Sequence, residues 1–249
     1  MPYANNQGVR IHYEVEGAGP PLVLQHGYTD SLESWYENGY VETLKRDHRL
    51  ILVDARGHGA SDKPHDNGAY AMERRTADIV AVLEALDMPR AHFFGYSMGG
   101  WIGFGMAKHA PARLNALVIG GSEPGPRVRA SNPLLQPDMI PLGAAGIPAI
   151  WDAPLSDALT RRLLANDIAA IRATPVDDPG YQDILPAMAM PCLLFAGEAD
   201  RVCPPMKAAA AKMPNATFLS FPGLAHAGTL HRADLVLPPL CAFLAKFLA

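Results

Sequence analysis

The feature that most restricts the fold of this chain is a glycine–serine motif placed between two segments of opposite character. Residues 95–99 read Gly-Tyr-Ser-Met-Gly; the apolar run Ala91–Phe94 precedes them, and a helix-compatible segment, Met98–His109, follows Ser97 directly. A serine on so tight a strand-to-helix turn takes a strained backbone, and side chains at the two glycine positions would clash with the neighbouring chain. The motif therefore predicts a strand, a sharp turn that presents Ser97, and a helix whose N-terminal amides face the serine.

Strand-like and helix-like segments alternate over most of the chain, which is typical of an α/β fold. Arg10–Glu16 alternates like an antiparallel strand with one wet face, whereas the other strand-like runs are short and apolar, as in buried parallel strands. We expect those strands at Leu22–Gln25, Leu50–Asp54, Ala91–Gly95, Leu114–Ile119, Cys192–Ala196 and Thr217–Phe221, and helices at Trp35–Lys45, Arg74–Leu86, Met98–His109, Lys207–Met213 and Asp234–Leu248.

The alternation stops after Gly121. Residues from Glu123 to about Ala189 are rich in proline and hold no apolar strand run, with helical pieces expected around Pro141–Trp151 and Leu155–Ile171. This stretch is either an ordinary long crossover connection or an insertion over the sheet, and connections longer than ~15 residues usually carry function. We therefore expect a core of residues 1–122 and 190–249, and a cap insertion at residues 123–189.

Composition and charge narrow the range of partners. The formal net charge of −4 argues against a nucleic-acid-binding surface, which needs clustered lysine and arginine. The three cysteines form no metal-ligand pair and no disulfide framework, and no run approaches the ~18 apolar residues of a membrane span. Since the N-terminal residues also lack a signal-peptide pattern, we expect a cytoplasmic protein, with its oligomeric state left open.

A serine hydroxyl becomes a good nucleophile only when a base takes its proton, so Ser97 requires a histidine. His226 follows the last expected strand and would return to the carboxyl edge of the sheet, where open α/β folds bind ligands. His12, His65, His92, His109 and His231 show no comparable placement. A carboxylate should orient the imidazole, and Asp200 directly follows the strand Cys192–Ala196. The order Ser97, Asp200, His226 is one of the known orders of this triad.

With these residues in place, the sequence resembles the α/β-hydrolase superfamily over nearly the whole chain except the insertion. The resemblance implies an eight-stranded, mostly parallel sheet with helices on both faces and a small helical cap. His26-Gly27-Tyr28 resembles the family's HG motif, which implies that the backbone N–H groups of Tyr28 and Met98 form an oxyanion hole. The run from Asp54 to Ser61 (DARGHGAS) resembles the family's D-x-R-G-x-G-x-S turn, which is structural in relatives.

Several assignments stay open at this level. Some relatives take the acid from the loop after the sixth strand, which here indicates Glu123 instead of Asp200. Asp30 is expected to cap the helix after the HG motif. Arg127 and Arg129 in the insertion are read as solvated charges, with pairing to an acidic substrate group as the alternative.

Serine at the turn favours acyl transfer to water, because relatives that displace halide or open epoxides use aspartate there. We expect a serine hydrolase that cleaves small to medium, fairly apolar esters or lactones and needs neither cofactor nor metal. Within the same fold, the alternatives are hydrolysis of carbon–carbon bonds in ring-cleavage products and a cofactor-free perhydrolase or haloperoxidase activity. An alternative of another class is a ligand-binding protein with slow turnover, and the fold alone does not rank these functions.

Overall fold

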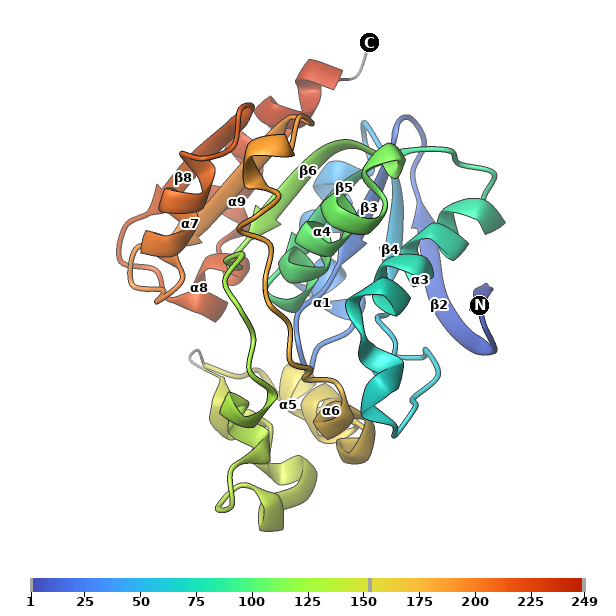
Figure 1. Ribbon diagram of the computed structural model, residues 1–249, viewed down its shortest axis with the longest axis vertical. Helices are drawn as coiled ribbons and strands as arrows, with labels where there is room; N and C mark the ends of the chain where they lie inside the picture. The colour runs from blue at the N-terminus through green and yellow to red at the C-terminus, as the bar shows by residue number, and fades with distance from the viewer. Residues whose placement is uncertain (1, 152–153, 248–249) are drawn as a thin grey trace.

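The computed structural model describes residues 2–151 and 154–247, and its centre is one eight-stranded sheet (Figure 1). The strand order is β1-β2-β4-β3-β5-β6-β7-β8; the pairs β1–β2 and β2–β4 are antiparallel and all others are parallel. The strands are β1 (Tyr3–Asn6), β2 (Val9–Glu16), β3 (Pro21–Gln25), β4 (Arg49–Val53), β5 (Ala91–Tyr96), β6 (Leu114–Gly120), β7 (Cys192–Gly197) and β8 (Ala216–Phe221). The predicted eight-stranded, mostly parallel fold is confirmed.

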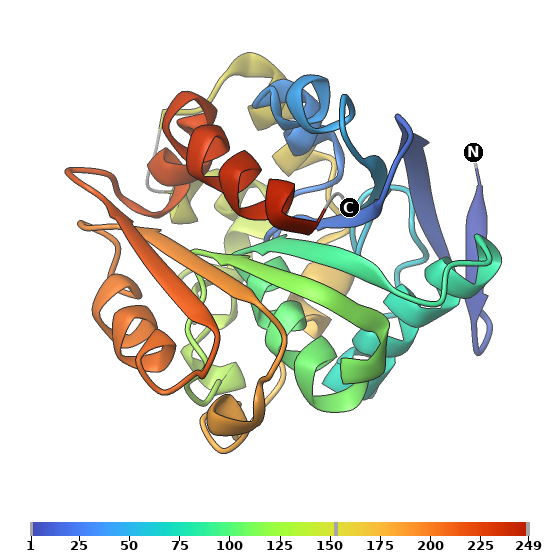
Figure 2. The same ribbon diagram turned by 90° about the horizontal axis from the view of Figure 1, so that it is seen from above.

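Helices cover both faces of the sheet, as the view from above shows (Figure 2). One apolar core lies under α3, α4 and α7, and a second lies under α1, α2, α8 and α9. Because both faces are covered, the central strands β5 and β7 are buried along their whole length. The helices are α1 (Glu33–Glu37), α2 (Tyr40–Leu44), α3 (Met72–Ala85), α4 (Met98–His109), α5 (Asp157–Leu164), α6 (Ile168–Ala173), α7 (Cys203–Ala210), α8 (His226–His231) and α9 (Ala233–Leu244).

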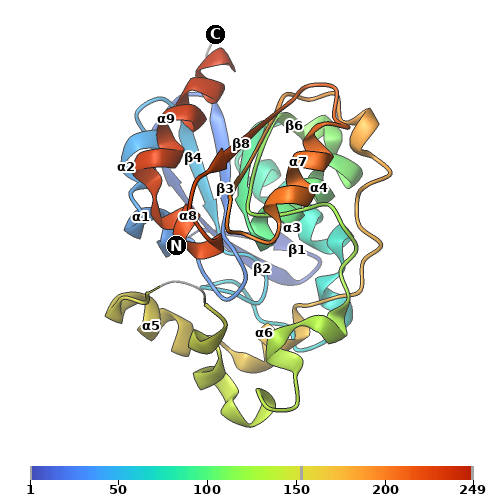
Figure 3. The same ribbon diagram turned by 90° about the vertical axis from the view of Figure 1, so that its left-hand side faces the viewer.

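The segment between β6 and β7, residues 123–189, places α5 and α6 beyond one end of the sheet and then returns along the sheet to the start of β7 (Figures 1 and 3). We call it the cap segment. It contains α5, α6 and several 3-10 turns. Some of its apolar residues form a small cluster around Leu134, Ile147 and Leu163, whereas Tyr181, Leu185 and Met188 pack in the core under α3, α4 and α7. Tyr28 of the sheet core packs on the small cluster. In the described part of the chain, no helix is both long and apolar enough to cross a membrane.

Several expected elements differ in detail, each for a local reason. The single helix expected at Trp35–Lys45 is broken into α1 and α2 at Gly39, which takes a left-handed φ of 78°. The helix expected at Leu155–Ile171 is likewise two helices, because Asp167 caps a new start by accepting from the amides of Ala169 and Ala170.

Two further segments were expected to be longer helices than they are. Around Pro141–Trp151 the chain makes only the 3-10 turns η5 (Ile140–Gly146) and η6 (Pro148–Ile150), since proline cannot donate a helical hydrogen bond. The last helix, α9, ends at Leu244 and continues as a 3-10 turn to Phe247; Leu248, the expected end, lies outside the described residues.

Candidate active site

Four connections at the carboxyl edge of the parallel strands supply the site. Ser97 follows β5, Tyr28 lies three residues after β3, Asp200 lies three residues after β7, and His226 comes after β8 as the first residue of α8. The carboxyl ends of parallel strands share one edge of a sheet, so the topology gathers side chains that are far apart in sequence.

Ser97 has the strained backbone that its motif predicts. Its φ of 55° and ψ of −114° lie in a region that residues with a side chain rarely occupy. A Cβ at Gly95 would lie 2.1 Å from the carbonyl oxygen of Gly99, and a Cβ at Gly99 would lie 2.0 Å from that of Gln25. The steric prediction for both glycines is therefore confirmed, and the turn leaves Ser97 at the N-terminus of α4.

The side chains of Ser97, His226 and Asp200 form a continuous chain of hydrogen bonds. Nε2 of His226 lies 2.8 Å from Oγ of Ser97, and its Nδ1 lies 2.6 Å from Oδ2 of Asp200. The Asp200 carboxylate is buried and also accepts from the amide of Val202 at 3.1 Å. The hydroxyl of Tyr96 donates to the carbonyl oxygen of His226 at 2.6 Å, which fixes the backbone of that residue.

The alternative acid, Glu123, has a different environment. Its carboxylate folds back over its own loop, where a Cβ at Gly125 would lie 2.5 Å from Oε2 of Glu123. The carboxylate hydrogen-bonded to the His226 imidazole is that of Asp200. The geometry thus favours Asp200 over Glu123 as the partner of the imidazole.

The loop after β3 brings Gly27 against the serine, where a Cβ at Gly27 would lie 3.3 Å from Cβ of Ser97. His26 fixes this loop from behind. Its Nε2 accepts from the amide of Ala55 at 3.0 Å, so its proton is on Nδ1, which donates to the carbonyl oxygen of Gly27 at 2.8 Å. The same peptide unit carries the N–H of Tyr28, which points opposite to that carbonyl because the peptide is trans.

The amide of Met98 is the other predicted oxyanion donor. Met98 is the first residue of α4, so its N–H has no carbonyl to bind within the helix. In the described chain, neither this amide nor that of Tyr28 donates to a backbone carbonyl. The oxyanion role of these two N–H groups stays a prediction, with which the missing backbone acceptors agree.

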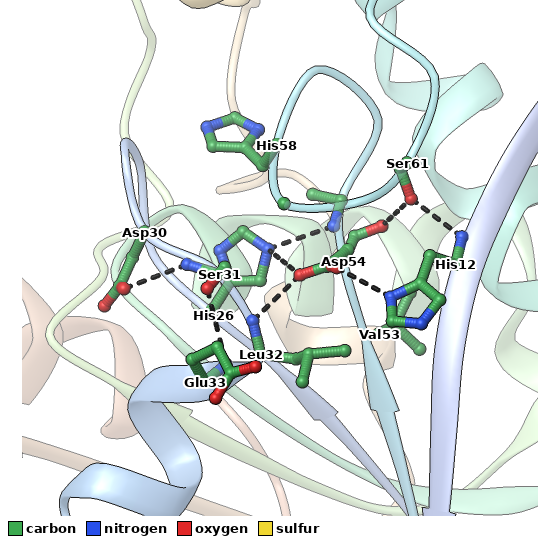
Figure 4. A network of polar contacts seen from close by, with 12 residues as sticks. His12, His26, Asp30, Ser31, Leu32, Glu33, Val53, Asp54, His58 and Ser61 are labelled. Carbon is green, nitrogen blue, oxygen red and sulfur yellow. Dashed lines mark hydrogen bonds and ion pairs between the residues drawn. The ribbon is translucent and has the colours of Figure 1, made fainter. Parts of the chain in front are cut away.

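A buried polar network supports the same loop (Figure 4). One carboxylate, Asp54, accepts from the amides of Leu32 and Ala60 at 2.9 Å each, and Nδ1 of His12 lies 2.8 Å from its Oδ2. Burial raises the pKa of Asp54, but the bond to His12, the nearby His26 and the two amides outweigh it and hold that pKa below its usual value. The sequence does not indicate this partner for His12, because only the fold brings β2 beside β4.

The cap segment is attached to the residues that follow the HG motif. The hydroxyl of Tyr28 donates to the carbonyl oxygen of Ile171 at 2.9 Å, and the Asn166 amide donates to that of Thr29 at 2.8 Å. Asp30 does not cap α1, as had been expected; its carboxylate pairs with Arg162 of α5 at 2.9 Å. This expectation was wrong because the helix begins three residues later, at Glu33.

The two arginines at the start of the cap segment are not the solvated charges that the sequence suggested. Both are half-buried. The Arg127 guanidinium lies over the Trp101 ring, 5.6 Å from its centroid, and Arg129 donates to the carbonyl oxygen of Pro175 at 2.6 Å. Trp101 itself, on α4, is buried in the core.

Comparison with known proteins agrees with this arrangement. The family described as alpha/beta hydrolase fold matches residues 20–163. A putative 2-succinyl-6-hydroxy-2,4-cyclohexadiene-1-carboxylate synthase of Bacillus subtilis is 34% identical over 48% of this chain, and the match spans only 43% of that relative's own length. A putative non-heme chloroperoxidase of a Synechocystis strain is 27% identical over 98% of this chain and 100% of its own.

Solved structures extend the likeness to the whole fold. One of them, an N-acyl homoserine lactone degrading enzyme, superposes with a TM-score of 0.80 at 26% identity and covers 97% of this chain and 100% of its own. The matched residues include β3 with the HG loop, the Ser97 turn and the first part of the cap segment. The chain therefore belongs to the α/β-hydrolase fold family.

Proposed function

We propose that this protein is a serine hydrolase that cleaves carboxylic esters or lactones of small to medium apolar substrates through an acyl-enzyme on Ser97. The observation that carries the proposal is the unbroken chain of hydrogen bonds from Ser97 through His226 to the buried Asp200. A serine, a base within 3 Å of it and a carboxylate behind the base are the parts that acyl transfer requires.

In the proposed reaction, Oγ of Ser97 attacks the substrate carbonyl carbon while Nε2 of His226 takes the serine proton. The Asp200 carboxylate stabilises the resulting imidazolium. The carbonyl oxygen becomes an oxyanion, which accepts from the amides of Tyr28 and Met98. When the tetrahedral intermediate collapses, the bond to the leaving oxygen breaks and His226 protonates that oxygen, giving an acyl-enzyme. Water, deprotonated by His226, then attacks the acyl carbon and releases the acid and Ser97.

The substrate class follows from the groups around the serine. All the groups that the reaction needs come from this chain, so the proposal includes no metal and no cofactor. The cap segment, which we propose as residues 123–189 of a two-part chain, contributes partly buried apolar residues such as Ile150, Trp151 and Leu155, which pack on the same small cluster as Tyr28. These favour an apolar acyl or alcohol group, and the likeness to a lactone-degrading enzyme supports including lactones.

The test is labelling with a fluorescent fluorophosphonate, followed by mass spectrometry of the labelled peptide. We expect the label on Ser97 and its loss in Ser97→Ala and His226→Ala, together with turnover of p-nitrophenyl acetate and of a short-chain γ-lactone. Ser220→Ala and His65→Ala, which change an exposed serine and an exposed histidine, serve as controls and should label normally. A folded protein that neither labels nor hydrolyses any ester or lactone would overturn the proposal.

A second candidate is a cofactor-free perhydrolase, favoured by the full-length likeness to a putative non-heme chloroperoxidase. Hydrogen peroxide would replace water as the nucleophile that attacks the acyl-enzyme, and the product would be a peracid. Oxidation of bromide in acetate and peroxide, lost in Ser97→Ala, would identify this activity. If peracid forms much more slowly than the ester is hydrolysed, the esterase assignment holds.

A further inference from the structure

Arg75, on α3, is a buried charged side chain that the proposed mechanism does not use. It is 3% exposed. Its Nε donates to the carbonyl oxygen of Tyr70 at 2.8 Å, its Nη2 donates to that of Thr174, and its Nη1 lies 3.3 Å from the sulfur of Met98. All three acceptors are electrically neutral, so the guanidinium makes hydrogen bonds without neutralising its charge.

The buried carboxylate whose charge acts on Arg75, that of Asp78, is bound to another arginine. Asp78 receives two hydrogen bonds from Arg56, at 2.6 and 2.5 Å. Within residues 2–151 and 154–247, no carboxylate forms an ion pair with Arg75 at the 4.0 Å limit. Burial lowers the pKa of Arg75 to about 10, so the side chain stays charged at neutral pH. Two guanidinium groups and one carboxylate leave a net positive charge inside the protein, an arrangement that is costly for folding.

This charge lies beside the side chain of Met98, whose backbone amide is one of the two proposed oxyanion donors. Met98, whose sulfur it contacts, is the residue directly after Ser97. Burial raises the pKa of the Tyr28 phenol, and a hydrogen bond to Asn132 and the charge of Arg75 act in the opposite direction. Burial and the neighbouring His26 hold the pKa of His58 well below its usual value; its bond to the Arg56 backbone acts in the opposite direction, and the charge of Arg75 lowers the pKa further. The imidazole of His58 therefore does not add a second charge at this place.

We propose that Arg75 is a positioning residue of the oxyanion site, which holds Met98 in place and supplies a fixed positive charge toward the oxygen that becomes negative. The proposal rests on the proposed function, since it concerns the same serine. A fixed charge in a region with little water interacts more strongly than it would in solvent. The substrate carbonyl is neutral and the tetrahedral intermediate is anionic, so the charge stabilises the second more than the first.

A purely structural role for Arg75 makes a different prediction. If the side chain only ties α3 to Thr174 and Tyr70, its loss changes stability and affects neutral and anionic ligands alike. If its charge matters, removing the side chain weakens the binding of the anionic state selectively. A lysine at the same place then restores most of that binding. Phenylboronic acid separates the two: Oγ of Ser97 bonds to boron, His226 takes the serine proton, and boron becomes tetrahedral and negative. Benzamide is the neutral comparison.

The experiment compares wild type, Arg75→Met and Arg75→Lys. For each protein it measures the inhibition constants of phenylboronic acid and benzamide, and kcat and KM for hydrolysis of p-nitrophenyl acetate. For Arg75→Met we expect about tenfold weaker binding of phenylboronic acid and about tenfold lower kcat, with benzamide binding and KM changed less than about twofold. Arg75→Lys should recover most of the lost boronate affinity. Equal weakening of both ligands, or a lysine variant no better than methionine, overturns the proposal.

Two outcomes need separate variants or controls. If Arg75→Met does not fold, Arg75→Gln takes its place, because glutamine keeps donors for the two carbonyls without the charge; the same selectivity against the boronate is then expected relative to Arg75→Lys. If wild type itself forms no boronate adduct and takes no fluorophosphonate label, the proposed function fails and this inference fails with it. If wild type does both and Arg75→Met binds the boronate equally well, only the role of Arg75 is wrong.

Discussion

Nδ1 of His226 lies 2.6 Å from Oδ2 of Asp200, and the two side chains differ sharply in exposure: the carboxylate is 2% exposed and the imidazole 33%. The buried carboxylate accepts from the imidazole and has little contact with water, while part of the imidazole stays accessible. Asp200 is therefore held in the interior, whereas His226 can contact a substrate.

Replacing Asp200 by asparagine tests this pair. The amide NH2 of asparagine can donate to Nδ1 of His226, which forces the imidazole proton onto Nε2. A protonated Nε2 can no longer accept the serine proton. We expect kcat on p-nitrophenyl acetate to fall about 10³-fold or more, with little change in melting temperature. Glu123→Gln is the matched control and should keep nearly full activity. An equal loss in Glu123→Gln would contradict the assignment of Asp200.

His26→Ala removes the two hydrogen bonds that hold the Gly27–Tyr28 peptide. The Ala55 amide loses its acceptor, and the Gly27 carbonyl oxygen keeps only the longer bond from the Asp30 amide, at 3.4 Å. Because the same peptide carries the Tyr28 N–H, we expect kcat to fall about 10²-fold while KM changes much less. Steady-state kinetics of the folded variant checks this, with His109→Ala, a partly exposed histidine of α4, as the control. A change confined to KM would show that the loop binds substrate without stabilising the oxyanion.

Asp54→Asn tests the network of Figure 4 through the pH dependence of stability. The pKa of Asp54 is lowered in the folded protein, so its carboxylate stabilises the fold above about pH 4, the usual pKa of an unfolded aspartate. This contribution is lost as pH falls through the lower, folded pKa. We expect the variant to be about 2–4 kcal/mol less stable at pH 7. In chemical denaturation, the gap between variant and wild type should narrow below pH 4, and a gap that stays constant to pH 3 would contradict the prediction.

Gly99→Ala should prevent correct folding of the Ser97 turn. The added Cβ would lie 2.0 Å from the carbonyl oxygen of Gln25, which belongs to β3 and cannot move away cheaply. We expect a destabilisation above about 4 kcal/mol, or insoluble protein. Gly228→Ala is the control, because a Cβ at that helical position meets nothing within 4 Å and alanine favours helix by about 1 kcal/mol. Circular dichroism with thermal melting distinguishes the two.

The sequence predicted the sheet well because its parallel strands are short apolar runs between turn residues. A strand that is buried on both faces needs apolar residues at nearly every position, so it is easily recognised. β1 (Tyr3–Asn6) was missed, because an edge strand of polar residues carries no such pattern. Ser97, His226 and Asp200 could be singled out because each follows a strand directly or within a few residues.

What the sequence could not supply are contacts made only by the fold. The pairing of His12 with Asp54 depends on β2 lying beside β4. Arg75 did leave a signal: it precedes Ile79 by four residues, so it lies on the apolar stripe of α3, where a charge is out of place. A charged residue on the buried side of a helix therefore indicates a buried polar contact even when no motif includes that residue.

Tyr28 gives the molecule a mechanical property that its catalytic assignment alone does not suggest. Its backbone N–H belongs to the peptide that faces Ser97, and its hydroxyl is tied to the carbonyl oxygen of Ile171 on α6. The position of α6 and the position of the peptide assigned to receive the oxyanion are therefore linked through one side chain. A substrate group that displaced Ile171 would act on that peptide as well, so the shape of the cap segment and the stabilisation of the transition state are coupled through a single tyrosine.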